Sequence, residues 1–186
     1  MQRLARWYLE LRGWTIVGER PTEPRLVVAA AHHTCNFDFL VFLAVVSHFR
    51  MRAAYIGKHT LFRWPFGGLM RRLGGIPVHR DSGQGIVEQV AEAIRSSEEI
   101  AVIIAVEGTR KRADHWRSGF YHIAEAAGVP IQLAFVDYPG RRTGLGPIVY
   151  PSGDVGADMD LIREFYAIAH GRHPELESPI RLREEG

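Results

Sequence analysis

Two continuous apolar runs, and a third that is apolar except for Gln132, constrain the fold of this chain more than any other feature of its sequence. They cover residues 26–31, 100–105 and 131–136, and the segments between them carry apolar residues at helical spacing. Strands with one wet face alternate polar and apolar residues, whereas continuous apolar strands belong to a sheet that is covered on both faces. Such strands alternating with helices predict an α/β fold with a mostly parallel central sheet flanked by helices.

Weaker patterns complete the expected order of elements. Further strands are expected at residues 53–56, 76–78 and 148–150, and helices at residues 39–48, after Gly83, at 120–127 and at 158–170. Residues 61–73 contain Pro65 and a pair of glycines, which predicts a broken helical stretch rather than a regular helix. No repeat or linker divides the 186 residues, so we expect a single domain with a loosely ordered tail at residues 174–186.

Cysteine content and hydropathy limit the cellular context. Cys35 is the sole cysteine, which excludes an intramolecular disulfide and suits a reducing, cytoplasmic compartment. The N-terminal residues 1–14 lack the features of a secretory signal. The longest apolar run, residues 37–46, contains Asp38 and is well short of the roughly 20 residues of a transmembrane helix. We therefore expect a soluble or peripheral protein.

Charge is distributed unevenly along the chain. The segment from Phe39 to Arg80 contains no acidic residue but seven Lys or Arg residues, interspersed with aromatic and aliphatic side chains. Such a segment suits a surface that meets anionic lipid headgroups or a phosphate-bearing substrate. It also fits a solvated basic face that offsets acids elsewhere. Nucleic acid is not an expected partner, because no known reader motif is present and acidic residues follow Arg80.

The first apolar run is followed by a histidine and an aspartate with potential for proton transfer. His33 and Asp38 lie five positions apart. An imidazole with one ring nitrogen facing a carboxylate is held in one tautomer, and its other nitrogen can take a proton from a hydroxyl. The pair therefore suits a general base. The spacing alone also fits two polar residues that end a strand and open a helix.

Two later predicted strands are followed by cations. Arg80 follows residues 76–78, and Glu107-Gly108-Thr109-Arg110 follows residues 100–105. Ligands of such sheets gather at the carboxyl ends of strands, and guanidinium groups bind phosphate oxygens in fork geometry. Lys58 is a further candidate phosphate ligand. In plainer interpretations Arg80 pairs with Asp81 or faces solvent, and Lys58 is an exposed surface lysine. Glu107-Gly108 is then only a turn.

Taken together and in order, four blocks resemble those of the glycerolipid acyltransferases, the family of bacterial 1-acylglycerol-3-phosphate acyltransferases. The resemblance covers about residues 25–137. The blocks are the His-x4-Asp sequence from His33 to Asp38, Gly75-Ile76-Pro77-Val78-His79-Arg80, Glu107-Gly108-Thr109-Arg110 and Gly128-Val129-Pro130-Ile131. The combination is far more specific than any single block.

The resemblance implies a single acyltransferase domain over residues 1–186 that moves an acyl group from an acyl-CoA or acyl carrier protein thioester to the hydroxyl of a lysophospholipid. His33 would be the general base, and Asp38 would orient it. A backbone amide near Val129 to Ile131 would stabilise the oxyanion. By the same resemblance, Arg80, Thr109 and Arg110 would hold the acceptor phosphate, with Lys58 as a further ligand. Gly108 would be a substrate-binding residue of the same turn, and Glu107 would shape the turn or contact the acceptor. No metal or cofactor beyond the co-substrate is implied.

Some residues depart from the family pattern. His79 stands where Asp or Asn is usual, and Cys35 stands where Ser or Thr is frequent, so we expect a packed thiol rather than a nucleophile. His32 is expected to be structural. The segment before the first block is short, so access to lipid would rely on the basic, aromatic surface, peripheral to the inner face of the membrane. Two alternatives remain open: an acyl-thioester hydrolase, and a non-catalytic protein that binds anionic lipid.

Overall fold

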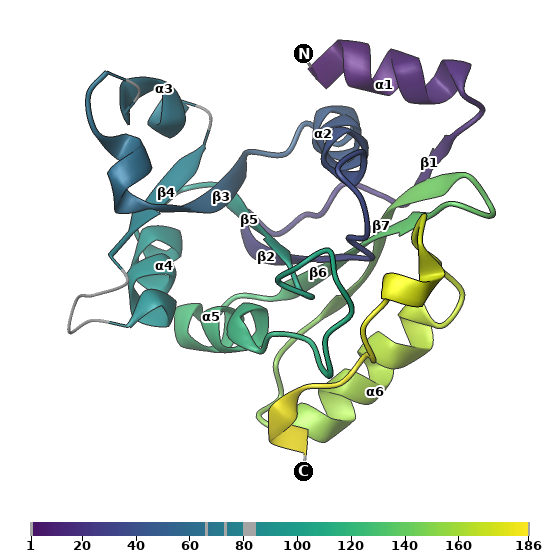
Figure 1. The fold of residues 1–186 in the computed structure, drawn as a ribbon. Helices are drawn as coiled ribbons and strands as arrows, with labels where there is room; N and C mark the ends of the chain where they lie inside the picture. The colour runs from purple at the N-terminus through teal and green to yellow at the C-terminus, as the bar shows by residue number, and fades with distance from the viewer. Residues whose placement is uncertain (1, 66, 73, 80–84, 186) are drawn as a thin grey trace.

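A seven-stranded sheet forms the centre of the computed structural model (Figure 1), which describes residues 2–65, 67–72, 74–79 and 85–185, without the side chains of residues 2–6, 58 and 61. Its strands lie in the order β1-β7-β6-β2-β5-β3-β4. The strands are β1 (Thr15–Val17), β2 (Arg25–Ala31), β3 (Ala53–Lys58), β4 (Gly75–Val78), β5 (Ile100–Ala105), β6 (Ile131–Asp137) and β7 (Arg142–Val149). The helices are α1 (Gln2–Leu11), α2 (Asp38–His48), α3 (Gly67–Arg72), α4 (Ile86–Arg95), α5 (Gly119–Ala127) and α6 (Val155–Tyr166). Three short 3-10 helices are η1 (His59–Phe62), η2 (Pro174–Leu176) and η3 (Arg183–Glu185).

Helices cover both faces of the sheet, and β2 shows why its sequence is apolar throughout. Val27 and Ala29 pack in a core cluster with residues of α4, α5 and α6, whereas Leu26 and Val28 pack with residues of α2. Alternate residues of a strand point to opposite faces, so a strand between two helical layers needs apolar residues at every position. Figure 1 shows α1 and α2 on one side of the sheet and α4, α5 and α6 on the other. The predicted α/β fold class is confirmed.

Strand direction brings the ends of five strands to one edge. β2 pairs in parallel with β5 and β6, and β3 pairs in parallel with β5 and β4. β7 runs antiparallel to β6 and pairs in parallel with β1. The carboxyl ends of β2 to β6 therefore lie at the same edge of the sheet, which is where His33, Lys58, Glu107 and Tyr138 follow or end a strand.

Several element boundaries differ from those expected from the sequence. β1 was not predicted, and β7 begins at Arg142, six residues before the predicted strand at 148–150. α6 begins at Val155, where the Asp154 side chain accepts a hydrogen bond from the Ala157 amide at 3.0 Å, and it ends at Tyr166 rather than at residue 170. The broken helical stretch at 61–73 is confirmed, because η1 and α3 are separate helices there.

The segment after residue 173 is packed, which differs from the loosely ordered tail that was expected. Leu182 is buried, and the buried Ser178 hydroxyl accepts a hydrogen bond from the Ala113 amide at 3.0 Å. The Arg181 carbonyl accepts from the Trp116 amide at 2.9 Å. These contacts hold the C-terminal segment against the loop between β5 and α5.

Candidate active site

The loop between β2 and α2 wraps around the carboxylate of Asp38. Asp38 is the first residue of α2 and is completely buried. Its Oδ2 accepts hydrogen bonds from the backbone amides of Thr34 at 2.8 Å and Cys35 at 2.9 Å. The carboxylate therefore folds the preceding loop around itself by satisfying two loop amides, rather than capping the free amides of α2. The same bonds fix the direction in which it faces.

His33 meets this carboxylate while keeping part of its ring accessible. Its Nδ1 lies 3.3 Å from Asp38 Oδ2, and 24% of its side chain is exposed. The ring nitrogen is not aligned for a straight hydrogen bond at this distance. Such contacts are often long in the absence of substrate and tighten in the reacting complex. With Nδ1 directed at Asp38, Nε2 is the nitrogen that can take a proton.

The second oxygen of Asp38 contacts two further residues. Tyr138 donates its hydroxyl to Oδ1 at 2.6 Å, and the Cys35 thiol donates to the same oxygen at 3.1 Å. The Tyr138 hydroxyl and Cys35 Sγ are also 3.2 Å apart. Tyr138 follows β6 and was not among the residues singled out from the sequence. A tyrosine 100 positions from its partner leaves no local signal, because only the strand order brings them together.

These contacts decide the ionisation of Asp38. Burial raises its pKa, but the contacts with His33, Tyr138 and Cys35 outweigh burial and lower the pKa below its usual value. Burial, followed by the bond to Asp38, raises the pKa of Tyr138 above its ordinary value. At neutral pH the pair is therefore a carboxylate and a protonated phenol, and the negative charge faces His33.

Glu107 is a buried residue of the third block that is hydrogen-bonded to the first block. Only 1% of Glu107 is exposed. Its Oε2 accepts from the backbone amide of His33 at 2.7 Å, and its Oε1 lies 3.3 Å from Nδ1 of His32. His32 is buried and its ring packs edge-on against Tyr166, in keeping with a structural residue. Of the two roles implied for Glu107, this geometry favours shaping the loops over contacting an acceptor.

The rest of the third block is exposed at the same edge. Gly108 adopts φ +66°, and a Cβ there would lie 2.8 Å from Cγ of Arg117, so the turn requires glycine. Thr109 accepts a hydrogen bond from the Lys111 amide at 3.2 Å. Arg110 is exposed, and its side chain forms no hydrogen bond or ion pair with the residues that the structure describes. An anion could approach this turn from solvent.

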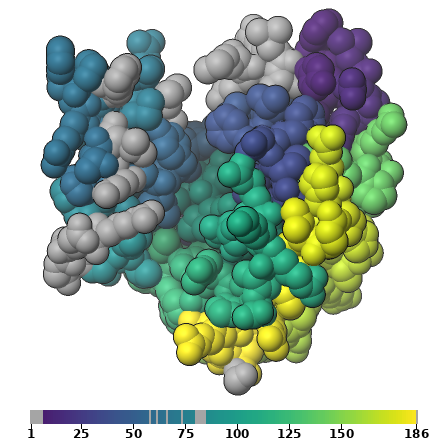
Figure 2. All heavy atoms as spheres, viewed as in Figure 1, coloured from purple at the N-terminus to yellow at the C-terminus, as the bar shows by residue number. Residues whose placement is uncertain are grey.

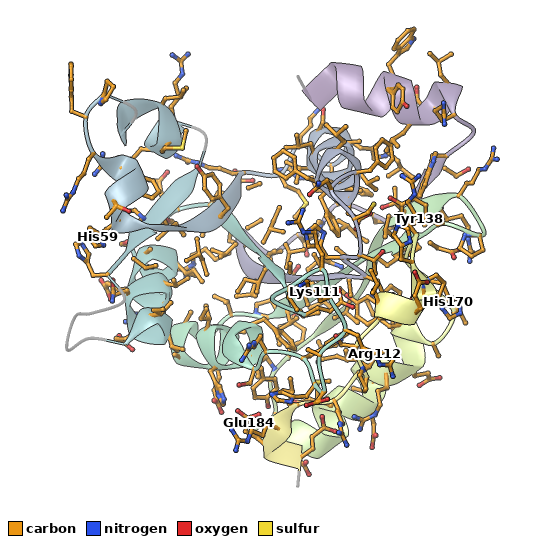
Figure 3. The ribbon with its side chains drawn as sticks, in the orientation of Figure 1. His59, Lys111, Arg112, Tyr138, His170 and Glu184 are labelled. Atoms are coloured by element: carbon orange, nitrogen blue, oxygen red, sulfur yellow. The ribbon has the colours of Figure 1, made fainter. Side chains whose placement is uncertain are left out.

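The second block ends at the same edge but is only partly described. Lys58 ends β3 and pairs with Val78 of β4, while the Lys58 side chain and the whole of Arg80 lie outside the described residues. The His79 ring stacks on His59 with centroids 4.3 Å apart. Figure 3 shows His59 far from Tyr138, so the second block and Asp38 lie on opposite sides of the candidate site.

The fourth block lies at the other end of the sheet, which corrects the expected oxyanion donor. Ile131 begins β6 and pairs with Val27, near the start of β2, whereas His33 follows the end of β2. At about 3.3 Å per residue along a strand, the two are roughly 20 Å apart. The Val129 amide also donates to the Ala124 carbonyl at 3.0 Å, as part of the end of α5. The fourth block therefore serves the turn into β6.

Large apolar side chains are exposed on α1, on the first turn of α2 and around η1 and α3. Their exposed fractions are 58% for Trp7, 64% for Leu11, 63% for Phe39, 43% for Leu40, 93% for Trp64 and 52% for Leu69. We call these six residues the apolar rim. Figure 1 shows α1, α2 and α3 on the same side of the molecule, and Figure 2 shows a hollow between α2 and the lobe that carries α3. None of the described helices is long and apolar enough to span a bilayer.

Comparisons with known proteins identify the family and the fold of the chain. Residues 15–134 match the sequence model of the family described as Acyltransferase. A crystal structure of PlsC from Thermotoga maritima, a 1-acyl-sn-glycerophosphate (LPA) acyltransferase, is similar in fold, with a TM-score of 0.59 and 18% sequence identity over 90% of this chain and 74% of that chain. No curated protein matches the chain. The family match extends over more than half of the chain and includes all four blocks, so the chain belongs to the acyltransferase family.

Proposed function

We propose that this acyltransferase moves a fatty acyl group from an acyl-CoA or acyl carrier protein thioester to the hydroxyl of a lysophospholipid such as 1-acylglycerol-3-phosphate. The observation that carries the proposal is the contact of His33 with the buried, ionised Asp38 at the strand edge where the exposed Thr109 and Arg110 also lie. The similarity in fold to a 1-acyl-sn-glycerophosphate acyltransferase supports this acceptor class.

The reaction follows from the position of His33. Its Nε2 takes the proton of the acceptor hydroxyl as that oxygen attacks the thioester carbonyl carbon, and Asp38 stabilises the resulting imidazolium. The tetrahedral intermediate then collapses: the new C–O ester bond remains, the C–S bond breaks, and the sulfur leaves with the proton from His33. The reaction consumes no metal or redox equivalent, and we propose no cofactor beyond the thioester co-substrate.

Acceptor binding is assigned to the cations and hydroxyl at the same edge. Arg110 and Arg80 would bind the phosphate of the acceptor, with the Thr109 hydroxyl and Lys58 as further ligands. Gly108 would let the backbone of the turn approach that phosphate. The support within the described residues is that Thr109 and Arg110 are exposed beside the loop that holds His33.

Contact with a membrane surface is the remaining part of the proposal. The apolar rim lies in a region of the molecule with exposed arginines at positions 12, 63, 71 and 72, and the sequence from Phe39 to Arg80 has no acidic residue. Apolar side chains among cations suit the interface of a membrane with anionic headgroups. We propose that the protein is peripheral, on the inner face of the cytoplasmic membrane.

Product analysis tests the reaction. The protein is incubated with acyl-CoA or with acyl carrier protein thioester and a mixed set of lysolipids, and products are identified by mass spectrometry. We expect a diacyl product whose formation requires both substrates, and thiol release that depends on acceptor. Thiol release without acceptor would favour a hydrolase, and salt-sensitive vesicle binding without thioester turnover would favour a lipid-binding protein.

The variant His33→Ala tests the assignment of the base. Loss of the general base should lower kcat by at least about 100-fold. The midpoint of thermal unfolding should stay nearly unchanged, because the ring is partly exposed and its side chain is not needed by the backbone of the loop. Substantial transfer by His33→Ala would contradict the mechanism.

A further inference from the structure

Tyr138 is the one contact of the Asp38 carboxylate that comes from outside the first block, among the residues that the structure describes. The amides of Thr34 and Cys35 and the Cys35 thiol all belong to the loop that leads into α2. Tyr138 instead follows β6 and reaches Oδ1 with a hydrogen bond of 2.6 Å, the shortest of these four. Hydrogen bonds to ionised carboxylates are short and about twice as strong as those between neutral groups.

The tyrosine is itself held in place on several sides. Its ring packs edge-on against Trp14, with centroids 5.0 Å apart, and its backbone amide donates to the His170 carbonyl at 2.8 Å. The Tyr138 carbonyl accepts from the amide of Arg141 at 3.2 Å. Figure 3 shows Tyr138 and His170 near each other beside the C-terminal segment. The phenol is therefore presented to Asp38 from a fixed backbone.

The two carboxylate oxygens of Asp38 have different partners, which indicates what the contact with Tyr138 does. Oδ2 faces Nδ1 of His33 and both loop amides, while Oδ1 faces Tyr138 and the Cys35 thiol. Thiols are weak donors, so without the phenol Oδ1 would be a buried oxygen with one weak partner. The carboxylate would then gain by turning or by taking a proton, and either change removes negative charge from His33.

We propose that Tyr138 is a positioning residue for acyl transfer, whose hydroxyl holds Oδ1 of Asp38 so that Oδ2 faces His33. This inference rests on the proposed function, because it assigns a part in the same proton transfer. Tyr138 acts through Asp38 and is not assigned a contact with either substrate.

The variant Tyr138→Phe removes only the hydroxyl. We expect kcat to fall about 10-fold, as for the loss of one hydrogen bond to a charged group, with both KM values within about two-fold of the wild type. The matched control is Tyr121→Phe, which removes a 2.7 Å hydrogen bond to the buried Asp158 near the start of α6. The control should leave kcat unchanged.

The same substitution in an Asp38→Asn background separates positioning from general stability. The loop amides require an oxygen at the Oδ2 position, so the amide nitrogen of Asn would face Tyr138 and the phenol would lose its acceptor. Tyr138→Phe should then change kcat by less than about two-fold in this background. An equal loss in both backgrounds, or a raised KM in either, would overturn the proposal.

A measurement without substrate keeps the inference testable if the wild type transfers no acyl group. The carboxyl group of Asp38 is titrated by NMR in the wild type and in Tyr138→Phe. The described titratable groups in contact with it are His33, Cys35 and Tyr138, and removal of the phenol should raise its pKa. An unchanged carboxyl titration would refute the role of Tyr138. Absence of transfer by the wild type together with a shifted titration would refute only the proposed function.

Discussion

At the scale of single residues, Asp38 shows how a buried carboxylate stays ionised. A charge without partners in an apolar interior would take a proton instead. Here the two oxygens accept from two backbone amides, a thiol and a phenol, and Nδ1 of His33 lies against one of them. The pKa is lowered in spite of burial. Asp38 therefore satisfies the donors of the loop and places a negative charge beside the His33 ring.

The variant Asp38→Asn should reveal the contribution to stability. An amide group leaves at least one of the surrounding donors without an acceptor, so we expect a free energy of unfolding lower by about 1–3 kcal/mol at neutral pH. His33→Ala should have a smaller effect. Chemical denaturation measures both, and a variant Asp38→Asn as stable as the wild type would show that the carboxylate adds nothing to the loop.

The free energy of unfolding should depend on pH differently in the wild type and in Asp38→Asn. Since the pKa of Asp38 is lower in the folded protein, its stabilisation is complete above the unfolded-state value of about 4 and is lost as pH falls through the folded-state value. The variant lacks this titration. The difference in unfolding free energy between wild type and Asp38→Asn should therefore shrink below about pH 4, and a difference that grew in acid would contradict the lowered pKa.

At the scale of elements, Glu107 connects the ends of β2 and β5. The strands already pair up to Ala30 and Ala105, and the Glu107 carboxylate continues the connection to the amide of His33 and the ring of His32. Each of these groups is part of a buried or half-buried loop, where an unpaired donor is costly. His33 is thereby held by Glu107 of the third block as well as by contact with Asp38.

Substitutions of Glu107 distinguish a positioning role from a contact with the acceptor. Glu107→Ala should lower the free energy of unfolding by about 3 kcal/mol, because it leaves two polar groups unpaired, and it should lower kcat. Glu107→Gln retains an acceptor for the His33 amide, so we expect roughly half of that loss. The surface variant Glu99→Ala, which removes a 3.0 Å ion pair with Arg20, is the control and should change stability little. A raised KM for the acceptor without loss of stability would favour the acceptor contact instead.

At the scale of the whole molecule, exposed apolar side chains are not all equivalent. The apolar rim lies around α1, α2 and α3 with arginines beside it, whereas Leu161 and Ile168 are exposed on and just after α6 on the other layer. Single exposed apolar residues are common on soluble proteins. A cluster of them among cations is more informative, and only such a cluster suits a lipid surface.

Vesicle binding tests this difference between the two sides. Trp64 is 93% exposed, and its replacement in Trp64→Ser should weaken binding to vesicles that contain anionic lipid, while Leu161→Ser should not. Binding of the wild type should weaken with salt. Co-sedimentation with vesicles of phosphatidylcholine alone and with added phosphatidylglycerol gives the measurement. Equal losses in the two variants would place the lipid contact elsewhere.

The sequence predicted the buried central strands, whose apolar composition is a local signal. It did not predict the strands whose only indication is pairing with segments far away in the sequence. The strands at 26–31, 100–105 and 131–136 are confirmed, because central strands covered on both faces are apolar at almost every position. β1 was missed because it is an edge strand of only three residues, and most of β7 was missed because its sequence mixes polar, glycine and proline residues.

The residues of the candidate site also fall into those that the sequence predicted and those that it did not. His33 and Asp38 were predicted to meet and do so, because they share one loop. Tyr138 was missed, and the inward direction of Glu107 could not be read from a Glu-Gly pair that also fits a simple turn. The assigned roles of Arg80 and Lys58 stay predictions, as do the substrate contacts of the third block.

Gly108 divides the third block into two halves that can change independently. Before it, Glu107 is buried and accepts a hydrogen bond from the loop that carries His33; after it, Thr109 and Arg110 are exposed, as are the following residues 111 and 112. Under the proposed assignment of acceptor binding to Thr109 and Arg110, substitutions in the exposed half should alter which headgroup is accepted without disturbing the loop of His33. For protein engineering, a mutant library aimed at acceptor preference should therefore randomise residues 109–112 and keep positions 107 and 108 constant.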